Sequence, residues 1–179
     1  MSTAKISFNF ERPDFVSKKL QGNRGPFAPV LMSLETLVAI NKWQLAQKNY
    51  PLLYKSGIFY HTNSDSHLLS YPGGILNYSP STEWHDIPTL LKIGKGDCKD
   101  LVAYRIAELS HYFHIEAKPI IKWKWIAKDP NGKFYDWKKR MSEHPDYFQK
   151  VLLIHVMVRY LDGKVEDPSK ILGMGGEYT

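Results

Sequence analysis

The chain contains one cysteine, Cys98, among its 179 residues. A single thiol excludes an intramolecular disulfide framework and any zinc or iron–sulfur site built on several cysteines. No run approaches the roughly 20 apolar residues of a membrane-spanning helix, and the N-terminus lacks the apolar segment of a signal peptide. Internal repeats and low-complexity tracts are lacking too. These absences predict a soluble, cytoplasmic protein with no membrane partner.

The composition is that of a folded domain. Hydrophobic residues make up 43% of the chain and aromatic residues 13%, which is enough to build a core and argues against disorder over the whole chain. The length corresponds to one domain, because domains usually contain roughly 100–200 residues.

The charge is positive, with a net value of +6 at pH 7 and a pI near 9.2. The simplest interpretation is a solvated basic surface, and attraction to an anionic partner is the alternative. The basic residues are spread along the chain, without a helix-turn-helix, zinc-finger or RNP-like pattern. We therefore do not expect nucleic acid as a partner.

The first 30 residues have the pattern of an extended arm, followed by a single domain over residues 31–179. Pro13, Pro26 and Pro29 interrupt any helical period there. The arm is rich in phenylalanine, which would pin it to the domain or, alternatively, contact an assembly partner. These residues are Phe8, Phe10, Phe15 and Phe27.

Helices precede strands in the rest of the chain. The periodicity predicts a helix from Leu34 to about Lys48, capped by Ser33, a strand over 58–61 and a short helix before Gly94. The later segments have the residue pattern of strands, and Asp162-Gly163 is a strong signal for a hairpin turn between two of them. These later strands are 117–126, 151–160 and 165–167. The order indicates an α+β fold, with a central cysteine-bearing helix on an antiparallel sheet.

Cys98 falls at the predicted first turn of that helix, in the segment Gly94-Lys95-Gly96-Asp97-Cys98-Lys99-Asp100. Asp97 is a favourable N-cap residue, and Asp100 has the spacing of a capping box. The glycines permit a sharp turn and a close approach by another group. Unpaired N–H groups and the helix dipole favour a thiolate at this position. The predicted buried stripe on the same face comprises Val102, Ile106, Leu109 and Phe113.

His155 lies within an otherwise apolar predicted strand. It is either a core histidine satisfied by the backbone or a catalytic base. The hairpin at Asp162-Gly163 returns the chain alongside it, so that Asp167 can reach the imidazole and fix its tautomer. Asp167 also has a simpler role, as a turn residue before Pro168. Glu166 and Asp162 are rival carboxylates, the first expected to face away and the second to belong to the turn.

The Gly94–Asp100 motif, His155 on a strand and Glu166-Asp167-Pro168-Ser169 occur in an order that resembles the transglutaminase-like superfamily of papain-type enzymes. The lead-in from Trp84 to Cys98 and the segment 166–174 resemble small bacterial and tailed-phage members. The resemblance implies a papain/transglutaminase-like core, with Cys98 as nucleophile, His155 as base and Asp167 as the orienting acid. It also implies a peptide or protein substrate and, for a phage protein, a location in the host cytoplasm or the virion.

The expected reaction is acyl transfer through a thioester, completed by water or by an amine. The backbone N–H of Cys98 would form half of an oxyanion hole, and Asn77 and Trp84 are candidates for the second donor. The remaining histidines show no spacing that indicates a ligand set, so we expect no metal and no cofactor. These are His61, His67, His85, His111, His114 and His144.

Two features depart from the superfamily pattern. No aromatic residue follows His155, and a basic, aromatic insert from Lys128 to Tyr147 is expected to cover the cleft. The alternative function is a structural or virion-associated assembly protein that uses the same fold with little or no catalysis.

Overall fold

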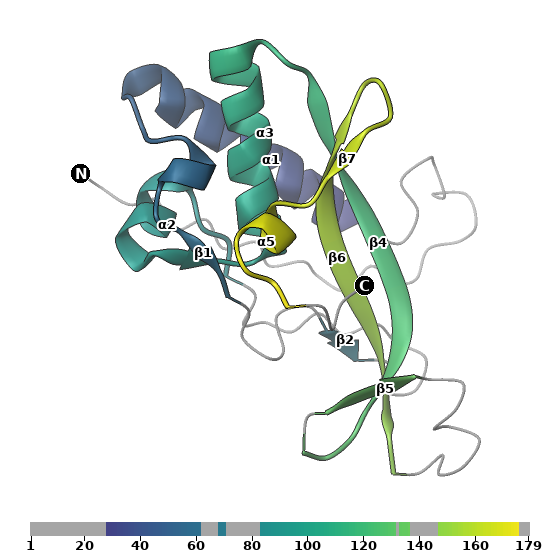
Figure 1. The fold of residues 1–179 in the computed structure, drawn as a ribbon. Helices are drawn as coiled ribbons and strands as arrows, with labels where there is room; N and C mark the ends of the chain where they lie inside the picture. Colours follow the sequence, from purple (N-terminus) through teal and green to yellow (C-terminus); the bar gives the residue numbers. More distant parts are fainter. Residues whose placement is uncertain (1–27, 62–67, 71–82, 132, 137–146, 176–179) are drawn as a thin grey trace.

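A long helix, α3, packs against one face of an antiparallel sheet in the computed structural model (Figure 1). The structure describes residues 28–61, 68–70, 83–131, 133–136 and 147–175. The helical elements are α1 (Ala28–Gln47), η3 (Leu53–Lys55), α2 (Ile87–Ile93), α3 (Cys98–Phe113) and α5 (Pro168–Ile171). The strands are β1 (Phe59–Tyr60), β2 (Leu68–Ser70), β3 (Lys95–Gly96), β4 (Ala117–Lys128), β5 (Phe134–Asp136), β6 (Gln149–Tyr160) and β7 (Val165–Glu166). The predicted α+β class with an antiparallel sheet against helix is confirmed.

Two long strands, β4 and β6, form the body of the sheet. They pair antiparallel over their full lengths, from Ala117 opposite Tyr160 to Lys128 opposite Gln149. The other edge of β6 pairs with β2 at residues 151–153 and with β7 at residues 158–159. Among the described residues, the middle of that edge, residues 154–157, therefore has no strand partner.

The cysteine helix is central, as predicted. One side of α3 joins α1 and the sheet in an apolar cluster that includes Val102, Ile106 and Val156. Its other side packs with η3 and α2 in a second cluster that includes Leu101 and Tyr104. The predicted stripe is correct as far as Leu109, but Phe113 is 47% exposed because the helix ends there.

The first helix begins earlier than the sequence pattern indicates. It starts at Ala28 rather than Leu34, and Ser33 is a buried residue within it rather than its cap. Pro29 was expected to break the helix, but proline is tolerated in a first turn, where its missing N–H has no intrahelical partner. Residues 28–30 thus belong to α1, and the rest of the expected arm lies outside the described residues.

The remaining predictions of elements are largely confirmed. The strands predicted at 117–126 and 151–160 are β4 and β6, each slightly longer, and the strand predicted at 58–61 is the shorter β1. The β6–β7 hairpin turns through Gly163, whose φ is +88°. None of the described helices is long and apolar enough to cross a membrane.

Gly96 provides a test of the packing just before α3. A Cβ at this position would lie 2.6 Å from Cδ2 of Leu90, which is fully buried. We expect Gly96→Ala to lower the free energy of unfolding by about 1–3 kcal/mol, because overpacking forces neighbouring atoms to shift. Urea denaturation measures this change. Gly175→Ala, with nothing within 4 Å of the added Cβ, is the control; an equal effect of both variants would contradict the packing argument.

Candidate active site

The N-terminal turn of α3 is held by local hydrogen bonds. The Asp97 carboxylate accepts from the backbone N–H groups of Lys99 (3.1 Å) and Asp100 (3.4 Å), which confirms the predicted cap. Gly94 ends α2 in the left-handed region, with φ of +74°. These features turn the chain sharply from α2 into α3 and place Cys98 at the first helical position.

The Cys98 thiol lies against the middle of β6. Its side chain is only 2% exposed and packs in the cluster that contains Ile154 and Val156. The backbone of Val156 hydrogen bonds to it. Val156 belongs to residues 154–157 of β6, which pair with β4 but with no described strand on the other edge.

The environment of Cys98 overturns the expected resting thiolate. Burial raises the pKa of the thiol well above its ordinary value, and the charge of Asp97 raises it further. The Val156 hydrogen bond and the Lys99 charge lower it, but they do not compensate. Removal from water therefore outweighs the helix N-terminus, and Cys98 is a neutral thiol in the resting protein.

His155 and Asp167 form the predicted pair. Nε2 of His155 lies 2.9 Å from Oδ2 of Asp167, and both side chains are largely buried. Burial is the largest single effect on the pKa of Asp167 and raises it, but the hydrogen bond with His155, the charge of His155 and the contacts with Lys170 together outweigh burial and leave that pKa below its usual value. Asp167 also caps α5 by accepting from the backbone N–H of Lys170 at 3.3 Å. The turn role and the histidine role coexist in one residue.

The three candidate residues come from elements that meet at one place. Cys98 contacts the backbone of Val156, and His155 is the preceding residue of β6. Asp167 follows β7, which pairs with the end of β6. Asp167 lies at Nε2 of His155, so Nδ1 is the ring nitrogen on the other side of the imidazole.

A second histidine–carboxylate pair was not predicted. Nδ1 of His85 lies 2.9 Å from Oδ2 of Asp100, and the His85 backbone N–H donates to Oδ1 at 3.0 Å. The hydrogen bond with Asp100 raises the pKa of His85, against the effect of burial. Asp100 thus bonds to His85, which anchors the segment before α2 to the first turn of α3.

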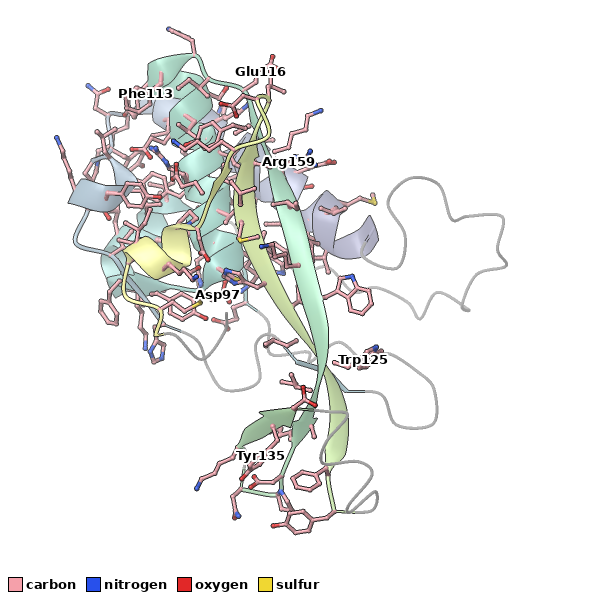
Figure 2. All side chains as sticks on the ribbon, turned by 45° about the vertical axis from the view of Figure 1, so that its right-hand side comes forward. Asp97, Phe113, Glu116, Trp125, Tyr135 and Arg159 are labelled. Atoms are coloured by element: carbon pink, nitrogen blue, oxygen red, sulfur yellow. The ribbon has the colours of Figure 1, made fainter. Side chains whose placement is uncertain are left out.

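Lys99 is also buried, which its position in a polar motif did not indicate. Its ammonium contacts the carboxylate of Asp97 and lies 3.9 Å from that of Asp100. The same ammonium lies 5.4 Å from the centre of the Trp84 ring. The cysteine turn is thus bounded by one ammonium and two carboxylates, and Figure 2 shows Asp97 of this group beside α5.

Glu166 faces α3 and not His155, as expected. Its Oε1 accepts from Nε of Arg105 at 2.7 Å, while Nη1 of Arg105 donates to Oε2 of Glu108, also at 2.7 Å. Tyr54 and Tyr160 donate their hydroxyl protons to Glu166. This network, which we call the Arg105 clamp, ties the strand before Asp167 to the helix that begins with Cys98.

Of the two candidates for the second oxyanion donor, only Trp84 lies within the described residues. Trp84 packs against the cluster that contains Cys98, under the Lys99 ammonium. Asn77 lies outside the described residues.

The described part of the 128–147 insert forms the β4–β5 hairpin, at the end of the sheet far from α3 (Figure 1), and its role as a cover stays a prediction. Within the described residues, no group of three or more histidine, cysteine or acidic side chains forms a potential metal site.

Comparison of the chain with protein families, with curated proteins and with solved structures finds no match. The functional argument therefore depends on the site itself.

The Arg105 clamp predicts a large loss of stability on truncation. Arg105→Met leaves the Glu108 and Glu166 carboxylates without their cation, and Glu108 is fully buried. Removing one partner of a buried ion pair costs about 3–5 kcal/mol. Urea denaturation checks this, with Lys42→Met on the exposed side of α1 as the control, expected to change stability by less than about 0.5 kcal/mol. A loss of the control's size for Arg105→Met would refute the clamp.

The raised pKa of Cys98 predicts the pH dependence of its alkylation. Because the thiolate reacts, the rate with iodoacetamide should rise about tenfold per pH unit from pH 6 to pH 9, without a plateau. The urea-unfolded protein is the reference, and its rate should level off near the ordinary thiol pKa of about 8.5. A rate in the folded protein that is already constant between pH 5 and 7 would mean a resting thiolate and contradict the effect of burial.

Proposed function

We propose that the protein is a transglutaminase-like cysteine hydrolase or acyltransferase acting on a peptide or amide bond. The observation that carries the proposal is the hydrogen bond between His155 and Asp167, on the strand whose backbone contacts the Cys98 thiol. We infer that the imidazole, oriented by a carboxylate and carried by the residue before Val156, serves a helix-starting cysteine as base, with Asp167 as the base's orienting acid. On this proposal the fold contains a papain-like core.

The proposed reaction proceeds through a thioester. Nδ1 of His155 takes the proton of the Cys98 thiol as the sulfur attacks the amide carbonyl carbon. The same proton then passes to the departing amine as the C–N bond breaks. Water, activated by His155, releases the acyl group as an acid, or an amine accepts it as a new amide. The backbone N–H of Cys98, at the start of α3, is the proposed donor for the oxyanion.

Burial of the thiol determines when the proton moves. A neutral resting thiol means that His155 acts as a general base at the moment of attack, rather than holding a permanent thiolate–imidazolium pair. Asp167 supports this role because its lowered pKa keeps it ionised at neutral pH, where it stabilises the imidazolium that forms.

The burial of Cys98 also favours a second candidate function. A thiol that is 2% exposed is poorly accessible to a large substrate, which fits an assembly protein that keeps the fold without the reaction. On this alternative the residues before α1 would supply contacts with partner proteins. The two candidates differ in whether Cys98 reacts with an acyl donor.

Acylation by a small activated ester tests the proposal. Incubation with p-nitrophenyl acetate should transfer one acetyl group to Cys98, detected by the mass of the intact protein and by release of nitrophenolate. His155→Ala should slow this step by roughly 10²–10⁴-fold, the usual contribution of a general base. Asp167→Asn should slow it by a smaller factor, since it leaves the imidazole in place.

His111→Ala is the matched control, because His111 lies in the last turn of α3, far along the helix from Cys98. It should leave the rate unchanged. Acetylation that proceeds equally in Cys98→Ser or in His155→Ala would exclude the proposed catalysis and leave the assembly function.

A further inference from the structure

The face of the β4–β6 pair that carries His155 is basic. In the register of the pair, Lys122 lies opposite His155 and Lys118 lies opposite Arg159. Positions 155 and 159 of β6 are an even number of residues apart, so both cross-strand pairs project from the same face. Lys118, Lys122 and Arg159 are all exposed. We call these three residues, together with His155 opposite Lys122, the basic face.

The opposite face of the same strands belongs to the core. Ile154, Val156 and Val158 of β6 pack there against α1 and α3. The basic face is therefore on the other side of the strand pair. Met157, which lies between His155 and Arg159 on this side, is only 5% exposed, so the exposed groups of the face are its three cations. Figure 2 shows its Arg159 end next to Glu116, with Trp125 and Tyr135 progressively farther along the strand pair.

The cations of the basic face are not neutralised within the described part of the chain. No described carboxylate lies within ion-pair distance of Lys118, Lys122 or Arg159. The acidic groups nearest in the chain are Glu116, which is exposed, and Asp162, whose carboxylate accepts from the backbone N–H of Lys164. Asp167 is occupied by His155.

The placement of these cations destabilises the sheet when no partner is bound. Like charges directly opposite each other in an antiparallel pair repel, and Lys118 faces Arg159. An anionic partner lying along the strand pair would relieve that repulsion. The two cross-strand pairs are four residues apart on β6, which corresponds to about 13 Å. In an extended peptide, side chains at i and i+4 project from one side with the same separation.

We propose that the basic face binds an acidic segment of a peptide or protein substrate and directs it to His155. The inference depends on the proposed function, of which it defines the substrate class. A peptide fits better than a single-stranded nucleic acid, because the exposed Trp123 pairs with Ile154 and so belongs to the opposite face. The basic face itself shows no described aromatic ring on which a base could stack.

The test measures binding separately from catalysis. Full-length protein with Cys98→Ala is titrated into a fluorescein-labelled peptide of alternating glutamate and threonine, and fluorescence anisotropy gives Kd. The expected result is binding that weakens with added salt and is lowered roughly tenfold or more by Lys122→Glu with Arg159→Glu. A peptide of alternating lysine and threonine should not bind.

The control replaces Lys42 and Lys55 with glutamate, which changes the net charge equally at exposed positions on α1 and η3. Its affinity for the glutamate peptide should fall much less than that of the basic-face variant. Equal losses of affinity in the two variants would mean that net charge alone determines binding, and this would overturn the proposal. Tighter binding of oligothymidine, lost in the same basic-face variant, would overturn it in favour of a nucleic acid.

A stability measurement checks the register independently. Arg159→Glu places an opposite charge across from Lys118, so the urea midpoint should stay unchanged or rise. A sharp fall would refute the assumed pairing on this face. Because the binding assay uses Cys98→Ala, a failure of ester acylation leaves its result intact, and a failure of binding leaves the acylation result intact.

Discussion

The contact between the Cys98 thiol and the backbone of Val156 joins the two halves of this structure. It requires a helix that begins with the cysteine and a strand whose edge is open at that point. β4 occupies one edge of β6 completely, and β2 and β7 occupy the two ends of the other. The N-terminal turn of α3 meets β6 at Val156, within the stretch that has no described strand on that edge, and the residue before Val156 is His155.

Two opposing effects act on the thiol at that contact. The first turn of a helix favours a thiolate, and such local charge–dipole effects are typically worth up to about 1–2 kcal/mol. Desolvation of a fully buried group can shift its pKa by several units, each unit being about 1.4 kcal/mol. Burial therefore wins at Cys98. On the proposed function, a neutral thiol must transfer its proton to a base during the attack, so the proposed reaction depends on the His155–Asp167 pair.

Local signals explain what the sequence could predict. The Asp97 cap, the α3 stripe and the Asp162-Gly163 turn each lie within one turn or one element, and the short hairpin was enough to bring Asp167 to His155. Interactions between distant segments left no such signal. His85 and Asp100 are 15 residues apart, and Arg105 and Glu166 are 61 residues apart. The stripe on α3 did indicate that Cys98 faces the interior, and the structure confirms it. What the sequence did not indicate is the effect of that burial on the thiol pKa, because it depends on elements that pack over the helix from elsewhere.

The ionic groups of α3 show what those distant contacts do. Lys99, Asp100 and Glu108 are nearly inaccessible to water, although a helix in this position could be filled with apolar residues at equal or lower cost. Lys99 bonds within its own turn, but Asp100 and Glu108 each join α3 to another element: Asp100 bonds to His85, which precedes α2, and Glu108 accepts from the backbone N–H of Leu53 in η3. Arg105, which is paired with Glu108, reaches Glu166 of β7. Apolar packing would permit α3 to slide or rotate slightly, whereas these bonds define one position. That position sets where Cys98 meets β6, so the buried charges are better explained by the precision of the site than by the stability of the fold.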